Sequence, residues 1–138
     1  MIGLKLNELK ISNKNWANDG TTNASIVNNN AGGTMTNNNE MNVTDTLTNN
    51  DTFLNGADET VTSAVLTATK IENNKTFTNY GTTTASTVNN NESGTMTNNN
   101  QMTVYGTLTN KGAVLNNSSA VIDATKIHNN DEKHWRMW

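Results

Sequence analysis

The feature that most constrains the fold of this chain is an internal repeat with a period of 61 residues. The heptapeptide Gly-Thr-Met-Thr-Asn-Asn-Asn occupies residues 33–39 and recurs unchanged at residues 94–100. Around it, residues 20–55 align without a gap on residues 81–116, with 24 identical positions in 36. After residue 55 the first copy carries five extra residues, around Gly56–Thr60. An insertion inside so close a duplication belongs in a surface loop.

Each copy is built from short segments in which an apolar residue is flanked by polar ones. Examples are Thr76-Phe77-Thr78, Met102-Thr103-Val104 and Thr107-Leu108-Thr109. Thr and Asn are poor helix formers, and no apolar stripe of helical period runs through the chain. We therefore expect strands of two to five residues, separated by Asn and Gly clusters that supply turn conformations.

Strands this short cannot support hairpins, but they can stack as the sides of a solenoid. The sequence predicts an all-β fold, a single-stranded right-handed parallel β-helix (β-solenoid) with about three coils of about 20 residues per 61-residue unit. Six or seven coils at a spacing of ~4.8 Å would form a rod about 30 Å long. We expect one solenoid domain over residues 1–138, with the duplication in 16–73 and 77–130. Lys-Ile-x-Asn words at residues 10–13, 70–73 and 126–129 suggest a third, partial echo.

The supply of apolar residues indicates a thin core. The chain has 29 Asn and 24 Thr, but only 24 residues that are Leu, Ile, Val or Phe. We expect Met35 and Met96 to point inward as core residues. The Asn triplets at 28–30, 37–39, 89–91 and 98–100 are interpreted as turn residues and interior stacks that satisfy polar groups. A ligand-binding row and an aggregation-prone segment are the other interpretations of these triplets.

Charge and hydropathy exclude several classes of partner. A net charge of -3 argues against binding to nucleic acid or to an anionic membrane. No run of 18 apolar residues predicts a transmembrane helix. Met1–Glu8 lacks the long apolar stretch of a signal peptide, so the export route stays open. The absence of Cys excludes a disulfide scaffold.

The sequence predicts no catalytic, metal or cofactor site, and we expect the chain not to be an enzyme. The acidic residues are scattered, and Glu40 and Asp45 of the first copy become Gln101 and Gly106 in the second. His128 and His134 have no second His or Cys at a metal-ligand spacing. Phosphate-binding loops and nucleophile motifs are also absent.

Six Thr-x-Thr pairs resemble the flat faces of β-solenoid antifreeze proteins. They begin at residues 34, 46, 67, 76, 95 and 107. The uneven intervals argue against an unbroken array, and solvent-facing residues chosen for β-propensity are the simpler interpretation.

Residues 131–138 depart from the composition of the rest of the chain. They include two of the three Trp residues. One interpretation is a cap over the open end of the core. A second is a docking segment for a partner or another subunit, with Trp135, Arg136 and Trp138 as its contact residues. A third is that the tail is not native.

The repeat words resemble those of a known group of bacterial surface proteins. Gly94-Thr95-Met96-Thr97-Asn98-Asn99 and the segment Gly106–Asn117 are similar to the Gly-Thr-Leu-x-Asn-x-Gly repeats of filamentous-haemagglutinin-like adhesins and autotransporter passenger domains. The resemblance covers roughly residues 16–128. It implies a right-handed β-helix that is displayed on or secreted from a cell and acts in adhesion, aggregation and biofilm formation.

The resemblance leads us to expect a structural or adhesive surface module, extracellular or on the cell surface. Its partners would be copies of itself, in a filament, or a cell or host surface. Two alternatives remain: a Thr-x-Thr solenoid that binds ice or another crystal surface, and a carbohydrate-binding β-helix like those of phage tails.

Overall fold

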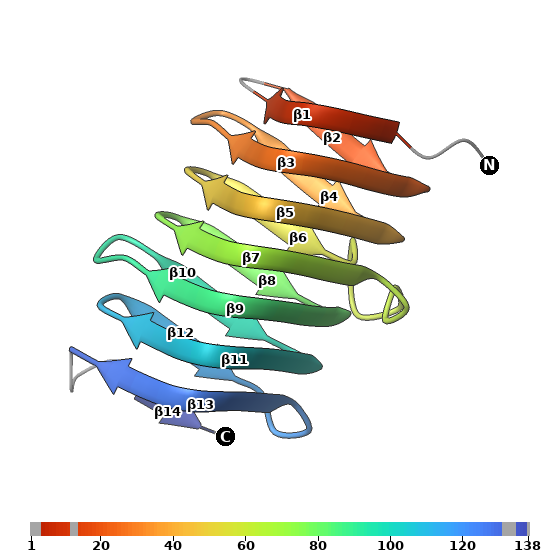
Figure 1. Ribbon diagram of the computed structural model, residues 1–138. Helices are drawn as coiled ribbons and strands as arrows, with labels where there is room; N and C mark the ends of the chain where they lie inside the picture. Colours follow the sequence, from red (N-terminus) through yellow and green to blue (C-terminus); the bar gives the residue numbers. More distant parts are fainter. Residues whose placement is uncertain (1–3, 12–13, 131–134, 138) are drawn as a thin grey trace.

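The computed structural model describes residues 4–11, 14–130 and 135–137, which form two parallel sheets of seven strands each (Figure 1). The chain alternates between the two sheets. We call them the long sheet and the short sheet after the lengths of their strands. The long sheet contains β1 (Leu4–Ile11), β3 (Thr21–Asn29), β5 (Glu40–Asn49), β7 (Val65–Asn73), β9 (Thr82–Asn90), β11 (Gln101–Asn110) and β13 (Val121–Asn129).

The short sheet lies behind the long sheet in Figure 1. It contains β2 (Asn15–Asn18), β4 (Thr34–Asn37), β6 (Thr52–Asn55), β8 (Thr76–Asn79), β10 (Thr95–Asn98), β12 (Ala113–Asn116) and β14 (Trp135–Met137). Each strand within a sheet pairs in parallel with the strands of the preceding and following coils, and the first and last strands pair on one side; Thr95, for example, pairs with Thr76 and Ala113. The predicted all-β fold of parallel strands stacked as a solenoid is confirmed.

The strands of the long sheet are longer than the sequence predicted. The words Met102-Thr103-Val104 and Thr107-Leu108-Thr109 belong to one ten-residue strand, β11. Inward alternation is interrupted between them, because Gly106, which strict alternation would bury together with Val104 and Leu108, is only partly buried. The register with β9 and β13 shifts at the same place. An interrupted alternation resembles a turn in sequence, but here the strand runs on and its pairing resumes beyond the interruption.

The core lies between the sheets and consists of rows that run from coil to coil. In the short sheet, Met35, Phe53, Phe77 and Met96 occupy one row and are fully buried. The rings of Phe53 and Phe77 stack with centroids 5.3 Å apart and planes 5° from parallel. The expected inward position of both methionines is confirmed. Each of these strands contributes one apolar side chain to the core, and the side chains of successive coils pack into a continuous row.

The five extra residues of the first copy lie in the loop between β6 and β7. This loop spans residues 56–64, whereas the equivalent loop between β12 and β13 spans 117–120. The side chains of residues 57–60 are exposed, so the expected surface insertion is confirmed. At the tip, the Oγ1 and backbone N–H of Thr60 donate to Asp58 Oδ1 at 2.5 and 2.8 Å, and these hydrogen bonds hold the pKa of Asp58 below its ordinary value.

In the first coil, the strand register differs from the sequence match by two residues. The Lys-Ile-x-Asn echo would place Ile11 with Ile71, but the strand register places Leu9 in that row and Ile11 in the row of Asn29. Leu9 is buried there. The echo at residues 10–13 is therefore out of register by two residues, because the inward pattern of β1 is set by its leucines.

Candidate functional site

Two ladders of Asn side chains line the corners where strands end. In each ladder the Nδ2 of one Asn donates to the Oδ1 of the Asn in the next coil, at 2.7–2.9 Å. The long-sheet ladder consists of Asn29, Asn49, Asn73, Asn90, Asn110 and Asn129. The short-sheet ladder consists of Asn18, Asn37, Asn55, Asn79, Asn98 and Asn116. The interpretation of the triplets as interior stacks is confirmed for one member of each.

The ladder amides also hold the turns in place. Nδ2 of Asn73 donates to the backbone oxygens of Lys75 at 3.0 Å and Thr95 at 3.2 Å, in addition to its bond to Asn90. Asn49 makes the equivalent bonds to Asp51 and Thr76. Because buried side-chain amides are occupied in this way, the ladders stabilise the fold and have little capacity left for a ligand.

One ladder has an unsatisfied end. The Oδ1 of Asn29 is buried and accepts no hydrogen bond from the described part of the chain. Its register partner in the preceding coil is Ile11, which has no side-chain amide. The long-sheet ladder therefore begins one coil later than the sheet itself.

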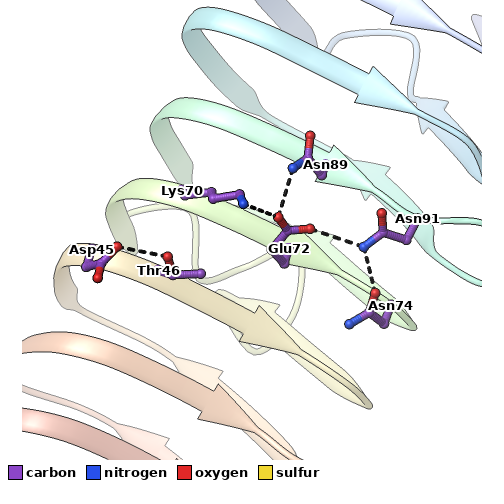
Figure 2. Close-up of polar contacts among 7 residues, drawn as sticks. All are labelled: Asp45, Thr46, Lys70, Glu72, Asn74, Asn89 and Asn91. Carbon is purple, nitrogen blue, oxygen red and sulfur yellow. Dashed lines mark hydrogen bonds and ion pairs between the residues drawn. The ribbon is translucent and has the colours of Figure 1, made fainter.

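A separate polar network lies on the outer face of β7 and β9 (Figure 2). Oε1 of Glu72 accepts hydrogen bonds from Lys70 Nζ at 2.5 Å and Asn89 Nδ2 at 2.9 Å. Oε2 accepts one from Asn91 Nδ2 at 3.2 Å, and Asn91 also donates to Asn74 Oδ1 at 2.7 Å. In the same view, Thr46 donates to Asp45 on β5, apart from this network.

The network lowers the pKa of Glu72. Partial burial alone would raise that pKa, but the hydrogen bonds from Lys70, Asn89 and Asn91 and the charge of Lys70 outweigh the burial. Glu72 is therefore held in its ionised form, which suits a structural ion pair and not a general acid.

Two surface grooves flank these features. The corner groove, beside the outer Asn residues, has a volume of about 490 Å³ and is lined in part by Asn74, Lys75, Asn91, Glu92 and Lys111. The side groove lies where the inward alternation of the long strands is interrupted, and it has a volume of about 350 Å³. Its lining includes Tyr105, which is 70% exposed and is the most exposed large hydrophobic residue of the described chain.

Thr side chains cover the outer face of the short sheet on four consecutive strands, β4, β6, β8 and β10. Seven of the eight outward positions are Thr, and the eighth is Leu54: Thr34, Thr36, Thr52, Thr76, Thr78, Thr95 and Thr97. The Thr-x-Thr pairs that begin at residues 46, 67 and 107 lie on the long sheet. The intervals between the pairs are uneven in the sequence because the pairs belong to two different sheets. Across β4, β6, β8 and β10, the array of outward Thr side chains is interrupted only at Leu54.

Two of the three predicted docking residues lie on the last strand of the short sheet. The backbones of Trp135 and Arg136 pair in β14 with Val114 and Leu115 of β12. By backbone register, Trp135 follows Val114, Met96 and Phe77 of the preceding coils. Trp138 lies outside the described residues.

Metal ligands do not gather in the part of the chain that the structure describes. It contains no group of three or more His, Cys, Asp or Glu residues that could hold a metal ion. His128 is exposed on β13, and His134 lies outside the described residues. The same described ranges contain no helix long and apolar enough to cross a membrane.

Sequence reasoning missed the side groove and the Glu72 network. One signal for the groove was present, because Tyr105 replaces Thr44 at the same position of the aligned copies. The signal for the network was weaker, since Lys70, Glu72 and Asn89 face each other only after two coils have been stacked in register.

Comparisons of this chain with protein-family models, with curated proteins and with solved structures found no match. The resemblance to adhesin repeats therefore stays a prediction.

Proposed function

We propose that this chain is a non-enzymatic rod module of a surface-displayed adhesin- or filament-type protein, and that copies of it stack end to end. In this proposal the solenoid is right-handed, as connections between parallel strands generally are, and each 61-residue unit supplies three coils. The module acts outside the cell by geometry, because a stiff rod presents the same side chains at each coil.

The observation that carries the proposal is the match between the two ends of the long sheet. Among the described strands, β1 pairs with β3 alone and β13 with β11 alone, so each end strand has one unpaired backbone edge. One buried row begins at Leu9 and ends at Ile127, which is 44% exposed and is covered by no described strand. Adding a second copy in the same register would place its Leu9 over Ile127.

Charge favours the same register. Glu8 precedes Leu9 and Lys126 precedes Ile127, so continuing the stack brings these opposite charges together across the junction. Within one chain, Glu8 already accepts from Asn28 at 2.8 Å and lies 3.4 Å from Lys10 Nζ. An exposed parallel edge with a complementary register can pair with another chain.

Sedimentation velocity across a range of protein concentrations tests this proposal. The unaltered chain should form dimers and longer species as the concentration rises. Lys126→Glu replaces an attraction by a repulsion and should weaken association roughly three- to tenfold, as expected for an exposed ion pair. Adding Glu8→Lys to the same chain should restore association, and the control Lys75→Glu, away from both ends, should not alter it. A monomer at every concentration would refute the stacking.

A second candidate function is binding to ice or to another crystalline surface through the Thr face of the short sheet. The observation that favours it is the run of Thr rows over four consecutive strands, at the regular ~4.8 Å spacing of paired strands. A thermal hysteresis assay decides it. Activity that is present in the unaltered chain and lost in Thr78→Lys, but kept in Thr48→Lys on the long sheet, would support it. The absence of hysteresis would exclude ice as the target.

A further inference from the structure

The side groove is a lined depression that runs across the long strands. Its larger part crosses β5, β7, β9 and β11 and has a volume of about 350 Å³. A smaller hollow of about 100 Å³ beside β1 and β3 shares Thr44 with it. From β1 to β11 the depression crosses six strands, or about 24 Å at the strand spacing. Its long direction therefore follows the solenoid axis.

The groove lies over the hydrophobic core and has a polar rim. Val43, Ala68 and Ala85 line it from below and are buried members of that core. The outward side chains beside them are Thr, Ser, Asn and Tyr, whose methyl groups and ring supply apolar surface among the polar groups. A concave site that combines apolar surface with a few polar groups is the usual form of a binding site for an organic ligand.

Four hydroxyl groups of the rim are free to bind a ligand. The side chains of Thr44, Thr67, Thr84 and Ser86 make no hydrogen bond to the described part of the chain. Each hydroxyl can both donate and accept. They lie on successive strands, so a ligand lying along the groove would meet a hydroxyl at each coil.

Tyr105 adds an aromatic surface at one end. Its backbone oxygen accepts a hydrogen bond from Thr125 Oγ1 at 2.8 Å, which fixes the strand there, but its side chain is exposed. An exposed tyrosine offers an apolar ring face together with a hydroxyl group. This combination suits the face of a sugar ring, which carries C–H groups and is edged by hydroxyl groups.

Among the described residues, the lining contains no charged side chain, which limits the ligand further. Every residue of both hollows is Asn, Ser, Thr, Tyr, Ala, Val or Leu. An anionic or cationic polymer would find no counter-charge within the groove. We propose that the side groove binds an uncharged polysaccharide chain that lies along the solenoid axis, with a sugar ring against Tyr105 and its hydroxyl groups bonded to the rim.

This inference rests on the adhesive part of the proposed function, to which it gives a chemical target. It is independent of end-to-end stacking, because the residues used here lie on the side of the rod and not at its ends. A sedimentation experiment on the same variants therefore separates failure of the groove from failure of the rod.

The test is titration of the full chain, labelled with ¹⁵N, with soluble hexasaccharides followed by NMR. The probes are the neutral hexamers of β-1,4-glucose, β-1,3-glucose, β-1,4-mannose and N-acetylglucosamine, and the anionic hexamer of galacturonic acid. At least one neutral hexamer should shift the amide signals of Thr67, Thr84 and Tyr105, and the galacturonic acid hexamer should not.

Two groove variants and one control complete the test. Tyr105→Thr, which installs the residue of the first copy, should weaken binding at least tenfold. Ser86→Arg should block the groove with a bulky charge, whereas Thr97→Arg on the short sheet should bind as the unaltered chain does. Both groove positions are exposed, so the fold should persist, and the amide spectrum checks this directly. Absence of shifts with every neutral hexamer, or equal binding by Tyr105→Thr, would overturn the inference.

Discussion

Asn55 and Asn79 lie 24 residues apart in the chain, yet Nδ2 of Asn55 donates to Oδ1 of Asn79 at 2.9 Å. The other pairs of the same ladder are 18 or 19 residues apart and have distances of 2.7–2.9 Å. The extra residues of the β6–β7 loop therefore leave the ladder unchanged. The ladder, and not the length of the connection, sets how one coil sits on the next.

Deleting residues 57–61 should leave the fold intact. The remaining connection, Gly56-Thr62-Ser63-Ala64, would have four residues, as does the equivalent connection Asn117-Ser118-Ser119-Ala120. Shortening an exposed loop changes the closure entropy by only about 0.6 kcal/mol for each halving of its length. Thermal unfolding followed by circular dichroism should show an unchanged β spectrum and a midpoint within a few degrees. Loss of cooperative unfolding would show that the loop itself supports the stack.

Asn73→Ala should be strongly destabilising. The substitution removes bonds to Asn49, Asn90, Lys75 and Thr95 and leaves the buried Oδ1 of Asn90 without its donor. We expect a loss of about 2–4 kcal/mol, since an unsatisfied buried polar group costs about 1–3 kcal/mol and several groups are affected. Urea unfolding measures the loss. The control is Asn39→Ala, at an exposed turn residue whose side chain donates to the backbone oxygen of Asp19 at 3.3 Å, and the loss should be small there. Equal losses at both positions would contradict the structural role of the ladder.

Met96→Asp should abolish cooperative folding. Met96 is fully buried in the row between Phe77 and Val114, and an unpaired carboxylate there has no counter-charge. Thr97→Asp places the same carboxylate one residue later, on the outer face of the short sheet, and should be tolerated. Far-ultraviolet circular dichroism and thermal unfolding distinguish the two variants. If Met96→Asp melted as the unaltered chain does, the inward assignment would be wrong.

The Glu72 network predicts a specific pH dependence. Because the folded pKa of Glu72 is lowered from about 4.5, its contribution to stability is fully present above that unfolded value and is lost as the pH falls through the folded pKa. Glu72→Gln should therefore be less stable than the unaltered chain near pH 7, and the difference should shrink in the acid range. Asn89→Ala removes one donor to the carboxylate and should show a smaller version of the same change. Urea unfolding at a series of pH values measures these differences, and a difference that stays constant with pH would contradict the prediction.

The repeat and its short apolar words were sufficient to predict parallel stacked coils, the inward methionines and the surface insertion. They were sufficient because each depends on local alternation or on the alignment of two copies. The long strands were missed because an interrupted alternation, as at Gly106 between Val104 and Leu108, has the same sequence pattern as a turn.

The candidate sites depended on register, which local patterns do not contain. The outer Thr face forms only when Thr34, Thr52, Thr76 and Thr95 are stacked, and Thr52 belongs to no Thr-x-Thr pair. The side groove likewise forms only when rim residues of several coils, such as Thr67 and Thr84, are stacked in one row. The Asn residues are the opposite case. They are the most conspicuous residues in the sequence, but the buried ones are largely hydrogen-bonded to one another and so offer little to a ligand.

The central claim is that buried Asn ladders hold the coils in register, and the side-chain amide signals test it most directly. In a ¹⁵N-resolved nuclear Overhauser spectrum, the ladder amides should exchange slowly with water and show contacts in ladder order, from Asn49 to Asn73 to Asn90. Outer residues such as Asn39 should exchange rapidly. If the 29 Asn side chains gave one crowded, rapidly exchanging group of signals without contacts between coils, the ladders would not exist in solution.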